Sequence, residues 1–436
     1  MKKTLAFTAL FAALALGSCN KEYLNPSTAS QPQVVTSSDG LITLSNGLQY
    51  RYATNGLLSV LYNTVAAGGL STRELVVLNQ GNTEENNVSV GGSSLDNANG
   101  IVRNLWTQAN LVKSNAGLVL ANVGNAPDAG TRSGIVAYVS IFRALSIGTL
   151  AQYFEQVPLV TQENAPFVDR VTALRDAVAQ LEVAAAQLAT TPVSADFTAK
   201  IVPGLDLPNT LQALIARYSL LAGDYDKALA AAGRVDLTKR SVFNFDESPL
   251  TRNPLFITAF GNRNLFEPTN ANLGLTGALT PDPADRRLPF LLRVSPPPTA
   301  TQNLGTGFYT ANSAAIPVYV PGEMLLIRAE AYARKNDLPN AVIELNRVRT
   351  KTATAADPLG AGLLPYAGPL TAADVLLDIY RNRLVELAYQ GFRLEDSRRF
   401  GRPGPGAPGA ERNRNFFPYP RVERENNPAT PVDPTI

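Results

Sequence analysis

Helical periodicity broken by long polar stretches is the feature that most constrains the fold. Between residues 101 and 123, apolar residues recur every three or four positions, as they do on one face of an α-helix. The stretches 79–99, 243–310 and 352–369 are rich in Asn, Gly and Pro, and we expect them to be irregular. The pattern predicts helices over 56–65, 101–123, 135–154, 170–188, 207–222, 225–235, 323–334, 338–350 and 372–389. We therefore expect a mostly α fold with an irregular, loop-rich half.

Two of the predicted helix pairs align with each other at an offset of 113 residues. In both, a small residue on the first helix is followed by a short turn, an apolar entry to the second helix, and an Ala where the two helices would touch. Small side chains allow such close approach in tetratricopeptide repeats, although the regular 34-residue period is absent here. An unrelated helical bundle is the alternative. The matched positions are Ala216 with Ala329, Asp224 with Asp337, Tyr225 with Leu338, and Ala228 with Ala341.

The N-terminus has the pattern of a bacterial lipoprotein leader. Lys2 and Lys3 precede an apolar run over 5–16, which is shorter than the roughly 20 residues that a membrane-spanning helix needs. The run ends in Leu16-Gly17-Ser18-Cys19, the motif cut before a lipid-modified cysteine. An ordinary signal peptide with a chance cysteine is the alternative. We predict a signal peptide at 1–18, lipid attachment at Cys19, a flexible tether over 19–37, and a single domain over 38–436 with parts 38–240 and 241–436.

Composition excludes several classes of protein. The chain has no His and one Cys, so histidine-based triads, histidine metal sites and intramolecular disulfides are excluded. With 38 Lys and Arg against 36 Asp and Glu, the net charge of +2 gives no reason to expect nucleic acid as a partner. We expect no cofactor and no metal. No segment after the leader is expected to reach membrane-spanning length, so the body is expected to be soluble.

Several strings resemble, in order, the SusD/RagB family of outer-membrane nutrient-binding lipoproteins. They are FRAL at 142–145 with YFEQVPL at 153–159, IRAEAYA at 327–333 with LNRVR at 345–349, RNRLVELAYQGFRLEDSRR at 381–399, and FPYP at 417–420 followed by Glu423 and Asn427-Pro428. The resemblance implies a SusD-like fold with a tetratricopeptide-type scaffold and a ligand-facing irregular half.

The resemblance also implies a function without chemistry. SusD-like proteins cap a TonB-dependent, SusC-like transporter at the outer membrane and hand it a captured nutrient. This chain is then expected to be a lipid-anchored protein facing the cell exterior, not an enzyme, with a glycan or peptide as ligand and an oligosaccharide as the default. An envelope scaffold without a small ligand is one alternative, and a secreted glycosidase is another.

The family takes its ligand contacts broadly from two irregular zones, so the resemblance places the candidate residues there. The polar run after residue 79 could instead be a solvated loop, and about half of the aromatic residues could be core. Trp106 lies inside a periodic helix and is expected to be core. The candidates are Asn82, Glu84, Asn86, Asn87, Phe260, Asn262, Arg263, Phe308 and Tyr309.

Charged residues near the C-terminal signature are interpreted as structural. Their spacing allows pairing on or just past one helix, and arginines would lower the pKa of carboxylates such as Glu395 and Asp396, against the needs of a general acid. Asp282 and Asp285 with Arg286 and Arg287 resemble a paired turn. A Ca²⁺ site at Glu84, Glu85 and Asn86 is a minor alternative to the absence of metal. The predicted network is Arg383, Glu386, Arg393, Asp396 and Arg399.

Overall fold

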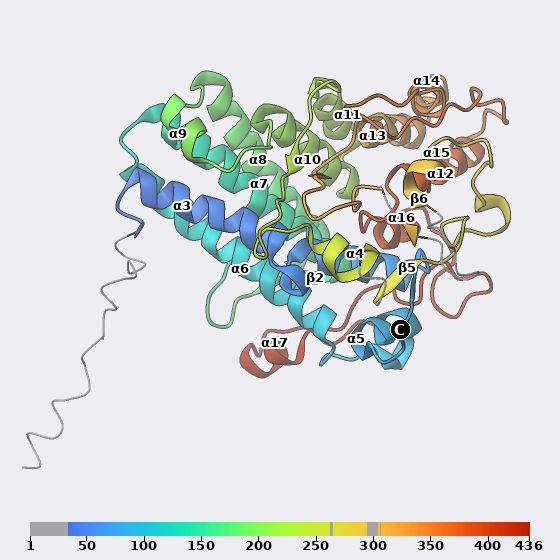
Figure 1. Ribbon diagram of the computed structural model, residues 1–436, viewed down its shortest axis with the longest axis horizontal. Helices are drawn as coiled ribbons and strands as arrows, with labels where there is room; N and C mark the ends of the chain where they lie inside the picture. The colour runs from blue at the N-terminus through green and yellow to red at the C-terminus, as the bar shows by residue number, and fades with distance from the viewer. Residues whose placement is uncertain (1–33, 262–264, 294–303, 306) are drawn as a thin grey trace, which may run out of the picture.

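Long helices form one side of the molecule, and a stack of helix pairs extends from them (Figure 1). The computed structural model describes residues 34–261, 265–293, 304–305 and 307–436. The longer helices are α3 (Ser38–Gln49), α4 (Val60–Ser71), α6 (Gly100–Asn122), α7 (Ala129–Tyr153), α8 (Arg170–Thr190), α10 (Leu207–Leu221), α11 (Tyr225–Arg234), α13 (Pro321–Arg334), α14 (Leu338–Arg349) and α15 (Ala372–Glu386). The short ones are α5 (Thr83–Val90), α9 (Ala195–Lys200), α12 (Leu288–Leu291), α16 (Arg393–Arg399) and α17 (Arg421–Asn426).

Strands in the described residues form only two-stranded antiparallel ribbons. Single π-helical turns occur at Tyr50–Thr54 and at η5 (Phe256–Phe260), and 3₁₀ turns at Gly56–Leu58, Gly92–Ser94, Val123–Asn125 and Gly277–Leu279. The ribbons pair β1 (Leu75–Val77) with β5 (Phe266–Pro268), β2 (Gln156–Pro158) with β3 (Phe167–Asp169), β4 (Val242–Phe243) with β8 (Ile316–Pro317), and β6 (Leu292–Arg293) with β7 (Leu304–Gly305). The fold is therefore mostly α, as predicted.

The two helix pairs that align at an offset of 113 residues have the same local structure. The side chains of Asp224 and Asp337 accept hydrogen bonds from the backbone N–H groups three residues on, at 3.1 and 3.3 Å, and cap α11 and α14. In the turns before them, Gly223 and Asn336 both have positive φ, 79° and 62°. The four matched alanines have no exposed surface. Because α11 also packs against α13, the two pairs form one continuous stack, and the predicted tetratricopeptide-type pairing is confirmed.

Helix α7 corrects one expectation. It is long and apolar enough to cross a membrane, by length and composition alone, whereas we expected no such segment after the leader. However, 89% of its most apolar window is buried by other parts of the chain. Gly148 on α7 faces Tyr218 on α10 so closely that an added Cβ would lie 2.2 Å from the Tyr218 ring. The helix therefore has the environment of a core helix.

Other differences lie at the N-terminal end and in the polar stretch 79–99. Helix α3 was not predicted, and the helix expected over 56–65 begins only at Val60. The stretch 79–99 is not wholly irregular, because α5 lies inside it. Its sequence TEENNVSV has no apolar periodicity, and only Glu85 and Val88 are buried, so tertiary contacts rather than local pattern hold it. The stretch 352–369 has no helix, as expected.

Candidate functional site

The face of α15 that carries Asp378, Arg381, Asn382 and Val385 forms one wall of an open cleft. Thr371 caps the helix by accepting the Asp374 N–H at 3.2 Å, which fixes where α15 begins. The opposite walls are the segments 278–285 and 362–368. Two adjoining cavities of about 490 and 510 Å³ share this wall, within the range of ligand pockets. The residues common to both cavities are Asp282, Arg349, Leu363, Asp378 and Arg381.

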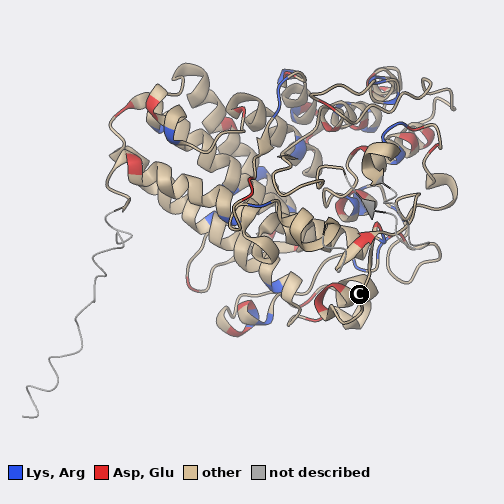
Figure 2. Ribbon diagram, viewed as in Figure 1, with Lys and Arg blue, Asp and Glu red and all other residues tan. Residues whose placement is uncertain are grey.

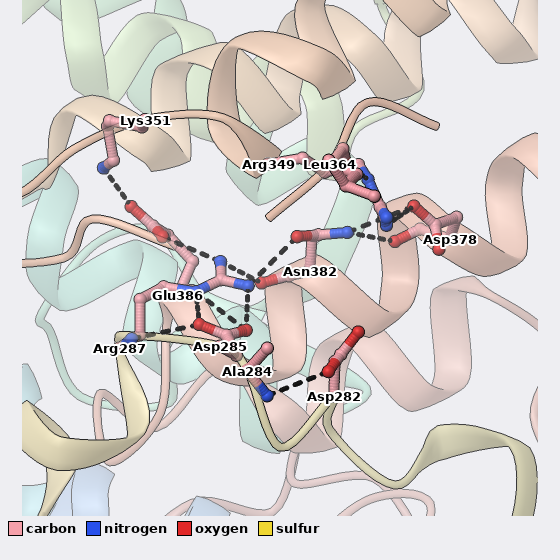
Figure 3. Close-up of polar contacts among 10 residues, drawn as sticks. All are labelled: Asp282, Ala284, Asp285, Arg287, Arg349, Lys351, Leu364, Asp378, Asn382 and Glu386. Atoms are coloured by element: carbon pink, nitrogen blue, oxygen red, sulfur yellow. Dashed lines mark hydrogen bonds and ion pairs between the residues drawn. The ribbon is translucent and has the colours of Figure 1, made fainter. Parts of the chain in front are cut away.

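A buried ion-pair network lies beneath this α15 cleft (Figure 3). The guanidinium of Arg287, 1% exposed, donates to Asp285 Oδ2 at 2.6 Å and to Glu386 Oε2 at 2.9 Å. Lys351 Nζ donates to the other oxygen of Glu386 at 2.6 Å. Burial disfavours the charge of Arg287, but the two carboxylates raise its pKa above the ordinary value. Because these groups are fully engaged with one another, they support the cleft and are not available to a ligand.

Asp378 and Arg349 connect the α15 wall of the cleft to the wall formed by the segment 362–368. Asp378 Oδ2 accepts from Arg349 Nη1 at 2.7 Å and from Asn382 Nδ2 at 3.3 Å (Figure 3). Arg349 Nε donates to the Leu364 carbonyl at 3.0 Å, and the Leu363 N–H donates to the Arg349 carbonyl at 2.7 Å. These bonds tie the segment 362–368 to the end of α14, so the cleft has two fixed walls.

Two charged groups in the cleft remain available. Arg381, whose side chain is 38% exposed, makes no hydrogen bond to the described residues, and its nearest carboxylate oxygen is 3.8 Å away on Asp378. Asp282 is exposed, and its carboxylate accepts only from the Ala284 N–H, at 2.9 Å, within the described chain. Tyr366 lines the same space, half-buried, and Leu364 is 82% exposed at its rim. The cleft thus offers a donor group, an acceptor group and an aromatic ring.

The polar candidates predicted on α5 have mixed placements. Asn82 is half-buried immediately before the helix, and Asn86 and Asn87 are half-buried on it. Glu84 is exposed, but its carboxylate accepts from the backbone N–H of Gly100 at the start of α6. Glu85 is buried and accepts from the Tyr62 hydroxyl at 2.8 Å. Glu84 and Glu85, two of the three residues considered as Ca²⁺ ligands, are therefore hydrogen-bonded within the fold. In the described parts of the chain, no group of three or more acidic or Cys residues lies close enough to hold a metal.

The aromatic candidates are largely internal, which corrects the expectation that they face a ligand. Phe260 is 7% exposed and Tyr309 is 3% exposed, and their ring centroids lie 4.9 Å apart. The Tyr309 hydroxyl donates to the Tyr389 carbonyl at 2.6 Å. Phe308 is half-buried and packs edge-on against Phe290, at 5.2 Å between centroids. Phe260 and Tyr309 therefore have almost no exposed surface for stacking on a ligand, whereas Phe308 keeps part of its surface open.

The β1–β5 ribbon brings the two predicted zones together, since β1 leads into α5 and β5 follows η5. The ribbon does not bring α5 and η5 to the α15 cleft. This cleft was not predicted from the sequence. By sequence, Asp282 belongs to a turn of paired charges, and Arg381 to the string 381–399 that resembles the family signature. Asn262, Arg263 and Cys19 lie outside the described residues.

The structural interpretation of the C-terminal charges is confirmed, with different partners. Within the predicted set, Arg383 and Arg399 both pair with Asp396, at 2.9 and 2.6 Å. The other members pair elsewhere, Glu386 with Arg287 and Arg393 with Glu74. Figure 2 shows charged positions interleaved around α14, α15 and α16, with few on α6 and α7.

The predicted lowering of the carboxylate pKa holds for Glu395 but not for Asp396. Burial opposes ionisation of Glu395, but Arg398 and Arg170 lower its pKa. Burial raises the pKa of Asp396 despite Arg383, against our expectation.

Trp106 is in the core, as predicted, with its Nε1–H donated to Glu423 at 3.1 Å.

Comparison with known proteins agrees with this architecture. Residues 299–431 match the model of the SusD family. A SusD homolog from Bacteroides thetaiotaomicron VPI-5482 superposes with a TM-score of 0.71 at 12% identity, covering 94% of this chain and 99% of the other. A SusD-like carbohydrate binding protein from Bacteroides fragilis NCTC 9343 gives 0.68 at 17% identity, covering 91% and 99%. No curated protein matches the chain. The resemblance read from the sequence is confirmed, and the fold is SusD-like.

Proposed function

We propose that this SusD-like chain is a cell-surface lipoprotein that captures a nutrient, by default an oligosaccharide, and passes it to a SusC-like TonB-dependent transporter in the outer membrane. The observation that carries the proposal is the similarity of fold, over 91% of the chain, to a SusD-like carbohydrate binding protein. The α15 cleft supplies the site. Membrane attachment is assigned to lipid on Cys19.

The chemistry of the cleft suits binding of a polyhydroxylated ligand. Sugar hydroxyls both donate and accept, so they can donate to Asp282 and accept from Arg381. The ring of Tyr366 offers an apolar surface to the C–H face of a sugar. Asn82, Asn86 and Asn87, in the predicted zone 79–99, are proposed as secondary contacts to the ligand.

The proposal assigns no reaction to the cleft. Glycoside hydrolysis uses two carboxyl groups, one of which acts as an acid and the other as a base or nucleophile. Of the three aspartates that line the cleft, Asp285 and Asp378 are each paired with an arginine, at 2.6 and 2.7 Å. Capture without turnover fits this arrangement better than catalysis.

Calorimetric titration of the mature chain with Cys19→Ala tests the proposal. The titrants are a panel of oligosaccharides and oligopeptides, and each mixture is then assayed for cleavage. We expect saturable binding of one glycan class with no product. Binding of peptides alone would change the nutrient class, cleavage would replace capture with hydrolysis, and no binding to any titrant would favour an envelope scaffold.

A further inference from the structure

The α15 cleft has a charge that the fold does not neutralise. Among its lining charges, Arg287 and Asp285 belong to the buried network with Glu386 and Lys351, and Asp378 is bonded to Arg349. Arg381 is left with a carboxylate that already has a closer partner, 2.7 Å from Arg349 against 3.8 Å from Arg381. Its positive charge is therefore only weakly compensated, and its side chain, 38% exposed, lines both cavities.

A second cation stands beside the cleft. Arg286 is exposed, and its side chain lies against Gly362, which lines the second cavity. Only its backbone N–H is engaged in the described structure, in a 3.0 Å bond to the Ala361 carbonyl. Arg286 beside the cleft and the weakly compensated Arg381 within it then outnumber the one lining carboxylate without an ion pair, Asp282. The balance favours a ligand that carries a negative charge and also hydroxyl donors.

We infer that the α15 cleft takes oligosaccharides that contain a hexuronate, with the sugar carboxylate on Arg381 and ring hydroxyls on Asp282. A guanidinium presents parallel N–H donors that match the two oxygens of a carboxylate. Tyr366 lies under the ring, and Arg286 adds long-range attraction. This inference rests on the proposed function and specifies its ligand class.

The test compares each ligand with an uncharged copy of itself. The probes are tetrasaccharides of galacturonate, glucuronate-containing tetrasaccharides and mannuronate oligomers, each as the free acid and as the methyl ester. The mature chain with Cys19→Ala is titrated in 20 mM and 200 mM salt. For at least one series we expect the acid to bind at least about 10-fold more tightly than its ester, with the difference shrinking in high salt.

Variants then locate the carboxylate contact. Arg381→Gln should weaken binding of the acid about 10-fold or more and binding of the ester much less, because the Gln amide can still donate to a hydroxyl. The melting temperature should change little, since the Arg381 guanidinium makes no hydrogen bond to the described residues. Asp282→Asn should weaken acid and ester alike. Arg421 on α17 is more exposed than Arg381, 69% against 38%, and pairs with Glu425 at 2.7 Å. Arg421→Gln is the surface control and should change binding of neither the acid nor the ester.

The outcomes separate this inference from the function it rests on. Tight binding of neutral glycans with no preference for any acid would overturn the hexuronate assignment and leave glycan capture standing. Preference for an acid that persists in Arg381→Gln would overturn the role of Arg381. Failure of every glycan to bind would overturn both.

Discussion

Arg217 and Glu323 form a buried two-point ion pair across 106 residues of sequence. Arg217 Nε lies 2.6 Å from Glu323 Oε1, and Nη2 lies 2.7 Å from Oε2, with both side chains almost fully buried. Nη2 also donates to the Val318 carbonyl at 2.8 Å. Since Arg217 lies on α10 and Glu323 on α13, this pair joins the two matched helix pairs.

Removing one partner of this pair should be strongly destabilising. Glu323→Gln leaves the Arg217 charge buried without a counter-ion, and we expect a loss of about 3 kcal/mol or more in the free energy of unfolding. The double variant Arg217→Met/Glu323→Met should lose less than the sum of the two single variants. Urea denaturation measures all three, and additive losses would mean that the two side chains do not depend on each other.

Lys113 makes the stability depend on pH. It is buried, it donates to the Pro158 carbonyl, and burial together with Arg143 lowers its pKa to about 7. In the unfolded chain a lysine titrates near pH 10.4, so the unfolded state binds more protons between about pH 7 and 10. The free energy of unfolding should therefore rise with pH in this window, by up to about 1.4 kcal/mol per unit from this group.

Lys113→Met isolates this contribution. The variant should be more stable than the parent at pH 7, with the difference narrowing as the pH rises to 9, as measured by urea denaturation at each pH. A difference that stayed constant between pH 7 and 9 would show that Lys113 keeps its charge in the fold.

The contact between α7 and α10 gives a paired glycine test. Gly148→Ala forces a methyl group against the Tyr218 ring, and we expect a loss of about 1–3 kcal/mol. Gly117→Ala on α6 meets no atom within 4 Å and should gain up to about 1 kcal/mol, because alanine favours a helix. Thermal unfolding compares the two. Equal effects would mean that the close approach is not maintained in solution.

Arg393 is expected to support the fold rather than bind a ligand. Its Nη1 donates to the Leu273 carbonyl at 2.7 Å, and its Nη2 lies 3.2 Å from the buried Glu74, whose pKa burial raises. Arg393→Ala should cost about 3 kcal/mol of stability and lower the melting temperature, while glycan affinity of the folded fraction is kept. Arg393 also lines a cavity of about 320 Å³, so lost binding at an unchanged melting temperature would make it a ligand contact.

Cys19 is expected to hold the protein at the membrane. Cys19→Ala should leave the melting temperature of the folded body unchanged and release the protein into the soluble fraction, because the acyl chains supply the attachment. Fractionation after a salt wash measures this, with the unaltered chain as control. Retention of the variant with the outer membrane would assign attachment to protein contacts instead.

Local spacing predicted most of the helices. Helix α6 runs from Gly100 to Asn122 against the predicted 101–123, and α10 and α11 differ from prediction by one residue at their C-terminal ends. In contrast, α5 has no apolar stripe, and its position follows from the Tyr62–Glu85 bond and the contact of Glu84 with α6. Such contacts join residues far apart in the chain and leave no local pattern.

The candidate site also depends on contacts between distant segments that local sequence does not indicate. Phe260 and Tyr309 lie in an irregular stretch, and nothing in that stretch distinguishes a ring that stacks on a ligand from one that packs on another ring. Only the approach of Tyr389 and Phe266 places them in the core. The α15 cleft requires that Asp282, Arg349 and Arg381 meet from three segments, which no spacing within one segment can indicate.

The sequence by itself determined most of the helix positions, the matched helix pairs and the lipoprotein-type pattern of the leader, because periodicity and short motifs act over a few neighbouring residues. Only the tertiary structure decided which aromatic residues are buried, which charges neutralise one another and where a cleft remains. These depend on the approach of distant segments, since the burial of a side chain and the compensation of a charge are properties of its surroundings in space.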